Sequence, residues 1–323
     1  MIPGLLAAAT VAAVAVICAH VVPLAGAPVF AIVLGVAIRA VGPLPAACKP
    51  GISFSARMVL QAAIVVSGFA LSLATVLRTG LGTLPVTLGT IAVALVLAPV
   101  LGRLLRLDAA LRTLVGVGTA ICGASAIAAV ASVIEPEEAD VALSIATVFF
   151  YNIVAVLVFP PIGHALGLGQ QAFGLWAGTA INDTSSVVAA GYVYGRDAGD
   201  YATIVKLTRA TLILPIVAAI ALWRARARGP ASARVPWKRI VPWFIVWFLA
   251  AALVNSSGIV PRSWHDPIAT VAVFMISVAL AAIGLQTELA RLLRAGARPL
   301  ALGFLLWVAV AVSSLAIQHA GGM

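Results

Sequence analysis

The chain has 323 residues, of which 63% are hydrophobic and 9% are charged, and its mean hydropathy is +1.15. A soluble domain carries about 25% charged residues, so this composition excludes a water-exposed globular protein. The formal net charge of +10 does not indicate a nucleic-acid partner, because the Lys and Arg residues lie between apolar runs, where anionic lipid headgroups and membrane topology explain them.

Apolar runs bounded by Gly, Pro and charged residues recur from end to end of the chain. Runs of about 20 residues are long enough to cross a bilayer, and these lack the alternation of β-barrel strands. The first run is expected to stay as a helix and not to be a cleaved signal peptide, because no Lys or Arg precedes Arg39. The sequence predicts an all-α polytopic membrane protein of about eleven transmembrane helices, with residues 1–323 as one domain. The predicted spans are 3–22, 28–41, 57–77, 84–103, 113–133, 141–162, 171–193, 201–223, 239–256, 266–287 and 299–318.

The basic residues give these spans an orientation. Odd-numbered gaps between the spans contain only Arg78, Arg196 and Arg262, whereas the even-numbered gaps contain every other Lys and Arg except Lys206 and Arg209. The positive-inside rule therefore predicts cytoplasmic even gaps, a cytoplasmic N-terminus and an external C-terminus. Residues 223–239 are expected to form a basic cytoplasmic linker between two halves. The acidic gap at 135–140 is expected outside.

One phrase occurs twice in this apolar chain. "GTAICGASAIAAV" begins at Gly118, and "GTAINDTSSVVAA" begins sixty positions later at Gly178. Such small and hydroxyl-bearing residues are typical of a helix broken inside the membrane and also of close helix packing, and the first phrase fits both. The second phrase favours a site, because an acid at membrane depth, here Asp183, marks function by default. The match extends to Asp140 and Asp200, and in the predicted topology its two copies run parallel.

A second pair of segments, 68–89 and 282–303, also resemble each other and are upside down relative to each other in this topology. Inverted repeats are typical of secondary transporters, whose site forms at the repeat interface from broken helices. The sequence therefore predicts an inverted-repeat transporter with discontinuous core helices.

Lys206 and Arg209 lie three residues apart within the eighth predicted span and share one helix face. Two interpretations are open. The side chains could extend to the membrane surface, or they could face the interior and pair with Asp183 or with an anionic substrate, near the N-terminal ends of half-helices.

At these residues the chain resembles the YeiH family, bacterial membrane proteins classed as sulfate exporters. The resemblance covers nearly the whole chain and implies a location in a bacterial inner membrane. It also implies a scaffold panel, a moving core and crossed broken helices, as in cation–proton antiporters and bile-acid symporters. Many family members have His-Glu or His-Asp at the position of Asn182 and Asp183, so this chain keeps the acid and lacks the histidine. The matching segments are "GFALSLATVLRTG", "GVGTAICGASAIAA", "GTAINDTSSVVAAGYVYG", the Lys206/Arg209 pair and "AAIGLQTEL".

The leading functional prediction is a secondary active transporter that exports a small anion such as sulfite or sulfate. Asp183 is expected to bind the coupling proton or sodium ion, while Lys206 and Arg209 neutralise Asp183 in one state and the substrate in another. The alternative is cation-coupled uptake of a small carboxylate or organosulfur anion. The other predicted substrate-binding residues are Thr119, Cys122, Gly123, Ser125, Asn182, Thr184, Ser185, Ser186 and Gln286.

Other classes of protein fit the sequence less well. A channel is a weaker interpretation, because a repeated broken helix with one acid suits the alternating access of a carrier better. Catalysis is not expected, because no HExxH or GxSxG motif occurs, and no cofactor or metal is expected either. The expected partners are the anionic substrate, the coupling proton or sodium ion, membrane lipid and, in a homodimer, a second copy.

Overall fold

The computed structural model describes residues 1–21, 26–228, 243–287 and 296–322, and these residues form helices without any strand. Within them, seven helices are long and apolar enough to cross a membrane. The predicted all-helical membrane class is thus confirmed. Most of the predicted linker at 223–239 lies outside the described residues.

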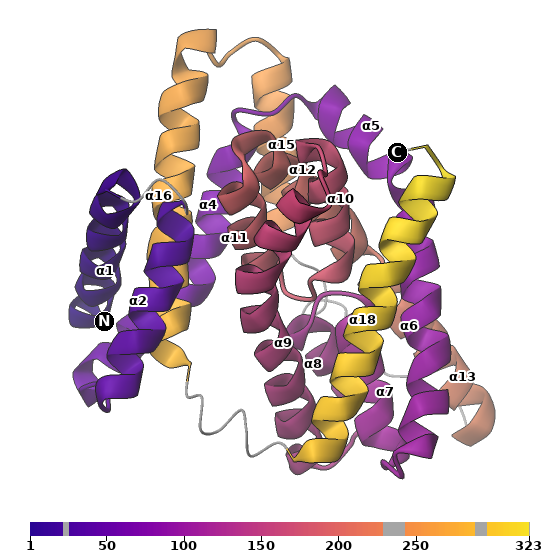
Figure 1. The fold of residues 1–323 in the computed structure, drawn as a ribbon. Helices are drawn as coiled ribbons and strands as arrows, with labels where there is room; N and C mark the ends of the chain where they lie inside the picture. Colours follow the sequence, from indigo (N-terminus) through magenta and orange to yellow (C-terminus); the bar gives the residue numbers. More distant parts are fainter. Residues whose placement is uncertain (22–25, 229–242, 288–295, 323) are drawn as a thin grey trace.

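One group of helices lies at the left of Figure 1: α1 (Ile2–Val21), α2 (Ala27–Val41) and α16 (His265–Gln286). The backbones of α2 and α16 are in close contact, because Gly35 of one helix faces Gly284 of the other. A Cβ atom on either glycine would overlap a carbonyl oxygen of the opposite helix. Small residues therefore allow the close approach of α2 and α16, as they do in many membrane helix interfaces.

The third predicted span, 57–77, is wrong in its bounds. A continuous helical run consists of η1 (Ala46–Cys48), α3 (Lys49–Phe54), the π-helix η2 (Ser55–Val59) and α4 (Leu60–Gly68). The separate helix α5 (Leu73–Gly82) begins at Ser72, whose hydroxyl accepts the backbone N–H of Thr75 at 3.1 Å. This N-cap starts a new helix. The single span that the hydropathy pattern predicts is therefore divided between α4, which ends at Gly68, and α5. Helix α15 (Trp243–Ser256) packs against α4.

A second group surrounds the centre of the molecule. It contains α6 (Leu84–Leu104), α9 (Glu138–Ala165), α18 (Ala297–Ala320), α12 (Arg196–Thr211) and α13 (Ile213–Arg228). The hydroxyl of Tyr151 in α9 donates to the carbonyl of Leu300 at 2.7 Å. The indole of Trp176 stacks on Phe159 at 4.2 Å and donates to the carbonyl of Ala311 at 3.0 Å. These contacts attach α9 and the following helix to α18.

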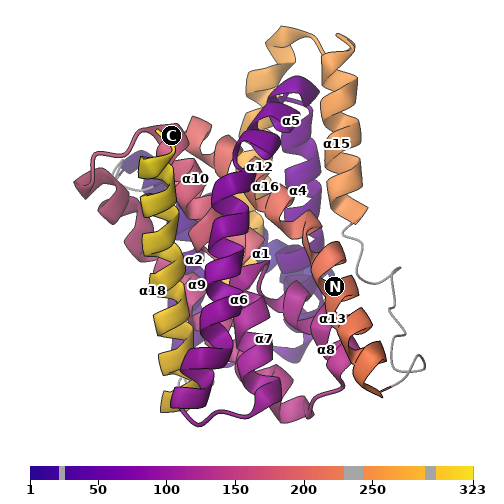
Figure 2. The same ribbon diagram turned by 90° about the vertical axis from the view of Figure 1, so that its right-hand side faces the viewer.

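The fifth and seventh predicted spans do not cross the molecule. Each is a hairpin of two short helices, α7 (Ala109–Ala120) with α8 (Ala124–Ile134) and α10 (Gln170–Ala180) with α11 (Thr184–Tyr194). In Figures 1 and 2, α7 and α8 both lie in the lower half, whereas Figure 1 places α10 and α11 in the upper half. The rings of Tyr194 and Phe173 stack at 3.8 Å, which places the end of α11 beside the start of α10. The predicted helix breaks are therefore present, but the chain reverses at each.

This reversal changes the predicted topology. We call the end of the molecule where α7 begins and α8 ends the α7 end, and the end where α10 begins and α11 ends the α10 end (Figure 1). The acidic segment 135–140 lies at the α7 end, together with the segment 104–112, so its predicted placement on the opposite side is wrong. Neither 135–140 nor the segment between α9 and α10 contains Lys or Arg, and so the positive-inside count is the same for both topologies.

Cysteine labelling distinguishes the two topologies. In a background without native cysteines, we expect Ala109→Cys and Glu138→Cys to react with an impermeant maleimide from the same side of the membrane, because both lie at the α7 end. Leu166→Cys, at the α10 end, should react from the opposite side. Labelling of Ala109→Cys together with Leu166→Cys from one side, and of Glu138→Cys from the other, would restore a crossing fifth span.

Candidate functional site

The tips of the two hairpins meet at one buried lysine. The ammonium of Lys206 in α12 donates to the carbonyl of Ile121 and to the carbonyl of Ile181, each at 2.9 Å, and its side chain is 0% exposed. These carbonyls end α7 and α10, where a helix has unpaired acceptors and partial negative charge. Ile121 and Ile181 are the fourth residues of the two "GTAI" phrases. The repeated phrase therefore encodes two equivalent helix ends that share one donor.

Arg209 holds the end of α7 from the same helix face. Its Nε donates to the carbonyl of Ala120 at 2.7 Å and its Nη2 to the carbonyl of Thr119 at 3.1 Å, and it too is 0% exposed. Both cations thus face the interior and do not extend to the membrane surface. Within the described part of the chain neither forms an ion pair with Asp183.

Asp183 begins α11 as its N-cap. Its carboxylate accepts the backbone N–H of Ser185 at 2.9 Å and also the hydroxyl of Ser185. The backbone N–H groups of Asn182 and Asp183 each donate to Oδ1 of Asn152 at 3.2 Å. Asn152 lies in the middle of α9 and is 2% exposed. Asn152 is not among the residues that the sequence pattern indicates, although it is the one amide in the apolar stretch "VFFYNIVAV".

A cavity of about 820 Å³ ends at the two tips. Its floor contains the first residues of α8 and α11, and its walls come from η2, α4, the first half of α9, and the last turn of α16. It therefore runs from the tips toward the α7 end. Arg57 and Asp183 are the charged residues among those lining it. The polar lining residues are Ser53, Arg57, Gln61, Ser125, Asp183, Thr184, Ser185, Gln286 and Thr287.

The structure divides the predicted site residues into two sets. The set that lines the cavity is Ser125, Asp183, Thr184, Ser185 and Gln286. The other set builds the tips or lies behind them and does not line the cavity. It consists of Thr119, Cys122, Gly123, Asn182, Ser186, Lys206 and Arg209.

Gly123 has a conformational role. Its φ of 70° belongs to a region that favours glycine, and this residue turns the chain back between α7 and α8. A Cβ atom at this position would lie 3.8 Å from the Cα of Asp183, so the two tips are in direct contact.

Comparison with known proteins places the chain in a family. A family model described as "Conserved hypothetical protein 698" matches residues 3–303. The chain belongs to this family. A relative named "UPF0324 membrane protein" from Streptococcus pyogenes serotype M3 is 41% identical over 332 residues, which cover 100% of this chain and 98% of that protein.

Two further relatives carry the same designation. The protein from Streptococcus pneumoniae serotype 4 is 39% identical over 92% of this chain and 90% of its own length. The protein from Streptococcus agalactiae serotype V is 37% identical over 98% of this chain and 96% of its own length. No solved structure matches the chain. The designation as membrane proteins agrees with the seven long apolar helices within the described residues, so the chain is a membrane protein of the UPF0324 family.

Asn152 offers a test of how the second tip is held. Asn152→Leu should leave two buried backbone N–H groups without an acceptor, each worth about 1–3 kcal/mol, and should lower the melting temperature in detergent. The matched control is Thr147→Val on the same helix, because the buried hydroxyl of Thr147 has no hydrogen-bond partner. That change should leave the melting temperature equal or higher. Equal stability of Asn152→Leu and wild type would mean that Asn152 does not support the tip.

Proposed function

We propose that the protein is a secondary active transporter that exports a small anion such as sulfite or sulfate, with its flux coupled to protons or a cation. The observation that carries the proposal is the cavity that is lined by the first residues of two broken helices, with Asp183 among them. Unwound helices that line a mid-membrane cavity form the substrate and ion sites of many secondary transporters. The site residues thus belong to one transmembrane domain.

The proposal includes an inverted repeat, made of residues 109–165 and 170–228. Each unit is a hairpin followed by a long helical run, and the hairpins enter from opposite ends (Figure 1). The "GTAI" phrases and the pair Asp140 and Asp200 occupy equivalent positions in the two units. This assignment replaces the parallel relation that the eleven-span topology gave to the two phrases.

The orientation that we propose places the α7 end in the cytoplasm of a bacterial inner membrane, with a cytoplasmic N-terminus. The chain passes from α2 to α3 and from α6 to α7 at this end (Figure 1), and these connections and the adjoining helix turns contain Arg39, Lys49, Arg103, Arg106 and Arg112. The opposite end has Arg78, Arg196 and Arg262. The excess of basic residues is typical of a cytoplasmic face, so the cavity would open to the cytoplasm.

Asp183 supplies a physical basis for coupling. Its carboxylate accepts the backbone N–H of Ser185 in the first turn of α11, and N–H donors of this kind bind anions at helix N-termini. An ionised Asp183 therefore competes with a substrate anion, and proton binding to Asp183 favours anion binding. One divalent anion with one proton carries a net charge of −1, and an inside-negative membrane potential favours its movement outward.

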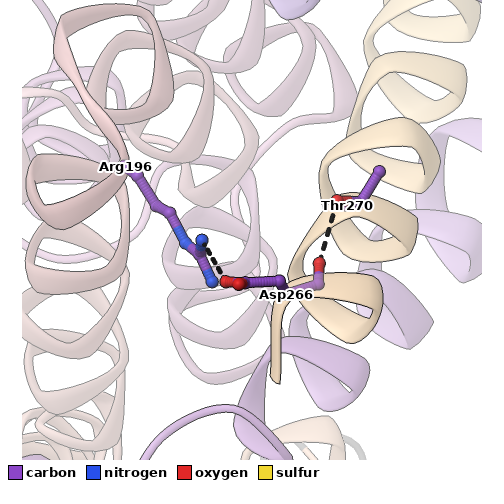
Figure 3. Close-up of polar contacts among 3 residues, drawn as sticks. All are labelled: Arg196, Asp266 and Thr270. Carbon is purple, nitrogen blue, oxygen red and sulfur yellow. Dashed lines mark hydrogen bonds and ion pairs between the residues drawn. The ribbon is translucent and has the colours of Figure 1, made fainter. Parts of the chain in front are cut away.

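Alternating access requires that the α10 end be closed while the cavity is open. An ion pair joins α12 to α16 there, with Nη1 of Arg196 2.8 Å from Oδ1 of Asp266 (Figure 3). The two side chains are 50% and 86% exposed, so the pair contributes little stability and can open at low cost. The alternative function, cation-coupled uptake of a small carboxylate or organosulfur anion, would use the same cavity in the opposite direction.

Replacement of Asp183 tests the coupling. Asp183→Asn should fold, because the amide oxygen still accepts hydrogen bonds at the N-cap of α11. In proteoliposomes its anion flux should stop or lose its dependence on an imposed proton or sodium gradient. Asp140→Asn, which changes an acid that does not line the cavity, should keep wild-type behaviour. Wild-type flux with unchanged gradient dependence in Asp183→Asn would remove Asp183 from the coupling mechanism.

Cross-linking at the α10 end tests alternating access. In a background without native cysteines, Arg196→Cys and Asp266→Cys joined by a reducible bis-methanethiosulfonate should block anion flux, and reduction should restore it. Each single variant treated with the same reagent is the control. Full flux through the cross-linked protein would contradict a gate between α12 and α16.

A further inference from the structure

We propose that Arg57 is the residue that binds the oxyanion in the open cavity, and that Lys206 and Arg209 do not contact it in this state. The inference rests on the proposed transport function and deepens it, because it assigns the specificity-determining cation to a residue outside the broken helices.

The first step is that the two buried cations are already bonded to the helix ends, although Nη1 of Arg209 has no hydrogen-bond partner. Lys206 and Arg209 donate to four backbone carbonyls between them, at 2.7 to 3.1 Å. Both are fully buried and neither lines the cavity. If either turned toward an anion, helix-end carbonyls would lose their donors inside the membrane, where unsatisfied backbone groups carry a high free-energy cost.

The second step is that Arg57 is accessible and unpaired. It lines the cavity and is exposed, and among the described residues it has no hydrogen bond or ion pair. It is therefore the basic side chain that an anion entering the cavity can reach. Its guanidinium carries five donors in a planar fork that matches the oxygens of sulfate, sulfonate or carboxylate groups.

The third step is the local geometry of the helix that carries Arg57. Ser53, Arg57 and Gln61 are spaced four residues apart and all line the cavity, so one polar stripe runs along this wall. Arg57 is the central residue of the π-helix η2, and single π-turns inside α-helices occur frequently at functional sites. The other helices of the described chain contain no such π-turn.

The fourth step is the surface that the anion would meet at the floor. Helix α8 begins at Gly123 without a side-chain cap, so no side chain competes for its first N–H groups, in contrast to Asp183 on α11. Ser125 and Thr184 add hydroxyl donors, and Gln286 adds an amide on the α16 wall. An oxyanion would therefore have the guanidinium on one wall and helix N-terminal donors at the floor.

The experiment uses the purified full-length protein in detergent. Thermal stability is measured against sodium sulfate, sodium sulfite and sodium methanesulfonate, with sodium chloride at matched ionic strength as the reference. An oxyanion that binds the folded state raises the melting temperature by mass action. Arg57→Gln should weaken the apparent affinity at least about tenfold, and Arg57→Lys should have an intermediate effect. Arg78→Gln, an exposed cation on α5 outside the cavity, is the matched control and should bind as wild type does.

The outcomes separate the two levels of the proposal. If wild type binds an oxyanion and Arg57→Gln binds it equally well, the assignment of Arg57 is overturned while the transport function stands. If wild type binds none of the three oxyanions, the proposed anion transport fails, and the Arg57 site fails with it.

A second measurement does not depend on the stability of an Arg57 variant. In a protein with Ser53→Cys as its one accessible cysteine, sulfate should slow modification by an anionic methanethiosulfonate, because both anions compete for Arg57 one helical turn away. Chloride at equal ionic strength should not slow it. Equal rates in sulfate and chloride would overturn the site.

Discussion

A lysine ammonium shared by two helix ends determines the architecture at the centre of this protein. A buried charge inside a membrane is costly, and Lys206 offsets that cost with hydrogen bonds to the carbonyls of Ile121 and Ile181. The same bonds satisfy backbone acceptors that would otherwise be exposed where α7 and α10 end. The chain can therefore stop a helix in the interior and turn back, twice, and bring the two turns together.

The polarity of the hairpins follows from this arrangement. Because Lys206 and Arg209 bind the C-terminal ends of α7 and α10, the N-terminal ends of α8 and α11 are left to form the cavity floor. Donors and partial positive charge thus face the cavity, with Asp183 among them, and cations stay behind the tips. In the proposed transport cycle the two tips would move as one body, since each is bonded to the same side chain.

Several of these features could be predicted from the sequence. The Gly and hydroxyl residues of the two phrases indicated helix breaks, which occur between Ala120 and Ala124 and between Ala180 and Thr184. The sequence indicates Asp183 as a site residue because an acid within an apolar run is costly, and Asp183 lines the cavity. Composition alone predicted the all-helical membrane class. Each of these features depends on neighbouring residues or on composition, so the sequence alone is enough to predict it.

The rest depends on contacts between distant segments. A helix that breaks and continues has the same hydropathy as one that breaks and reverses, and the gaps that would distinguish them contain no Lys or Arg. The partners of Lys206 are backbone atoms, which no residue type identifies. The hydropathy pattern places Arg57 at a span boundary, because the sequence does not show that its helix starts earlier, at Ala46, and passes along the cavity.

The central claim is that one side chain holds both hairpin tips, and hydrogen-exchange mass spectrometry of Lys206→Met tests it directly. Methionine keeps the length and burial of the side chain but donates no hydrogen bond. We predict faster amide exchange in peptides that cover 118–126 and in peptides that cover 178–187, although these segments are far apart in the sequence. Thr208→Ala on the same helix, which removes a hydroxyl bonded within α12, should leave both segments as protected as in wild type. Faster exchange in one segment alone, or in neither, would contradict the shared lysine as the element that joins the two tips.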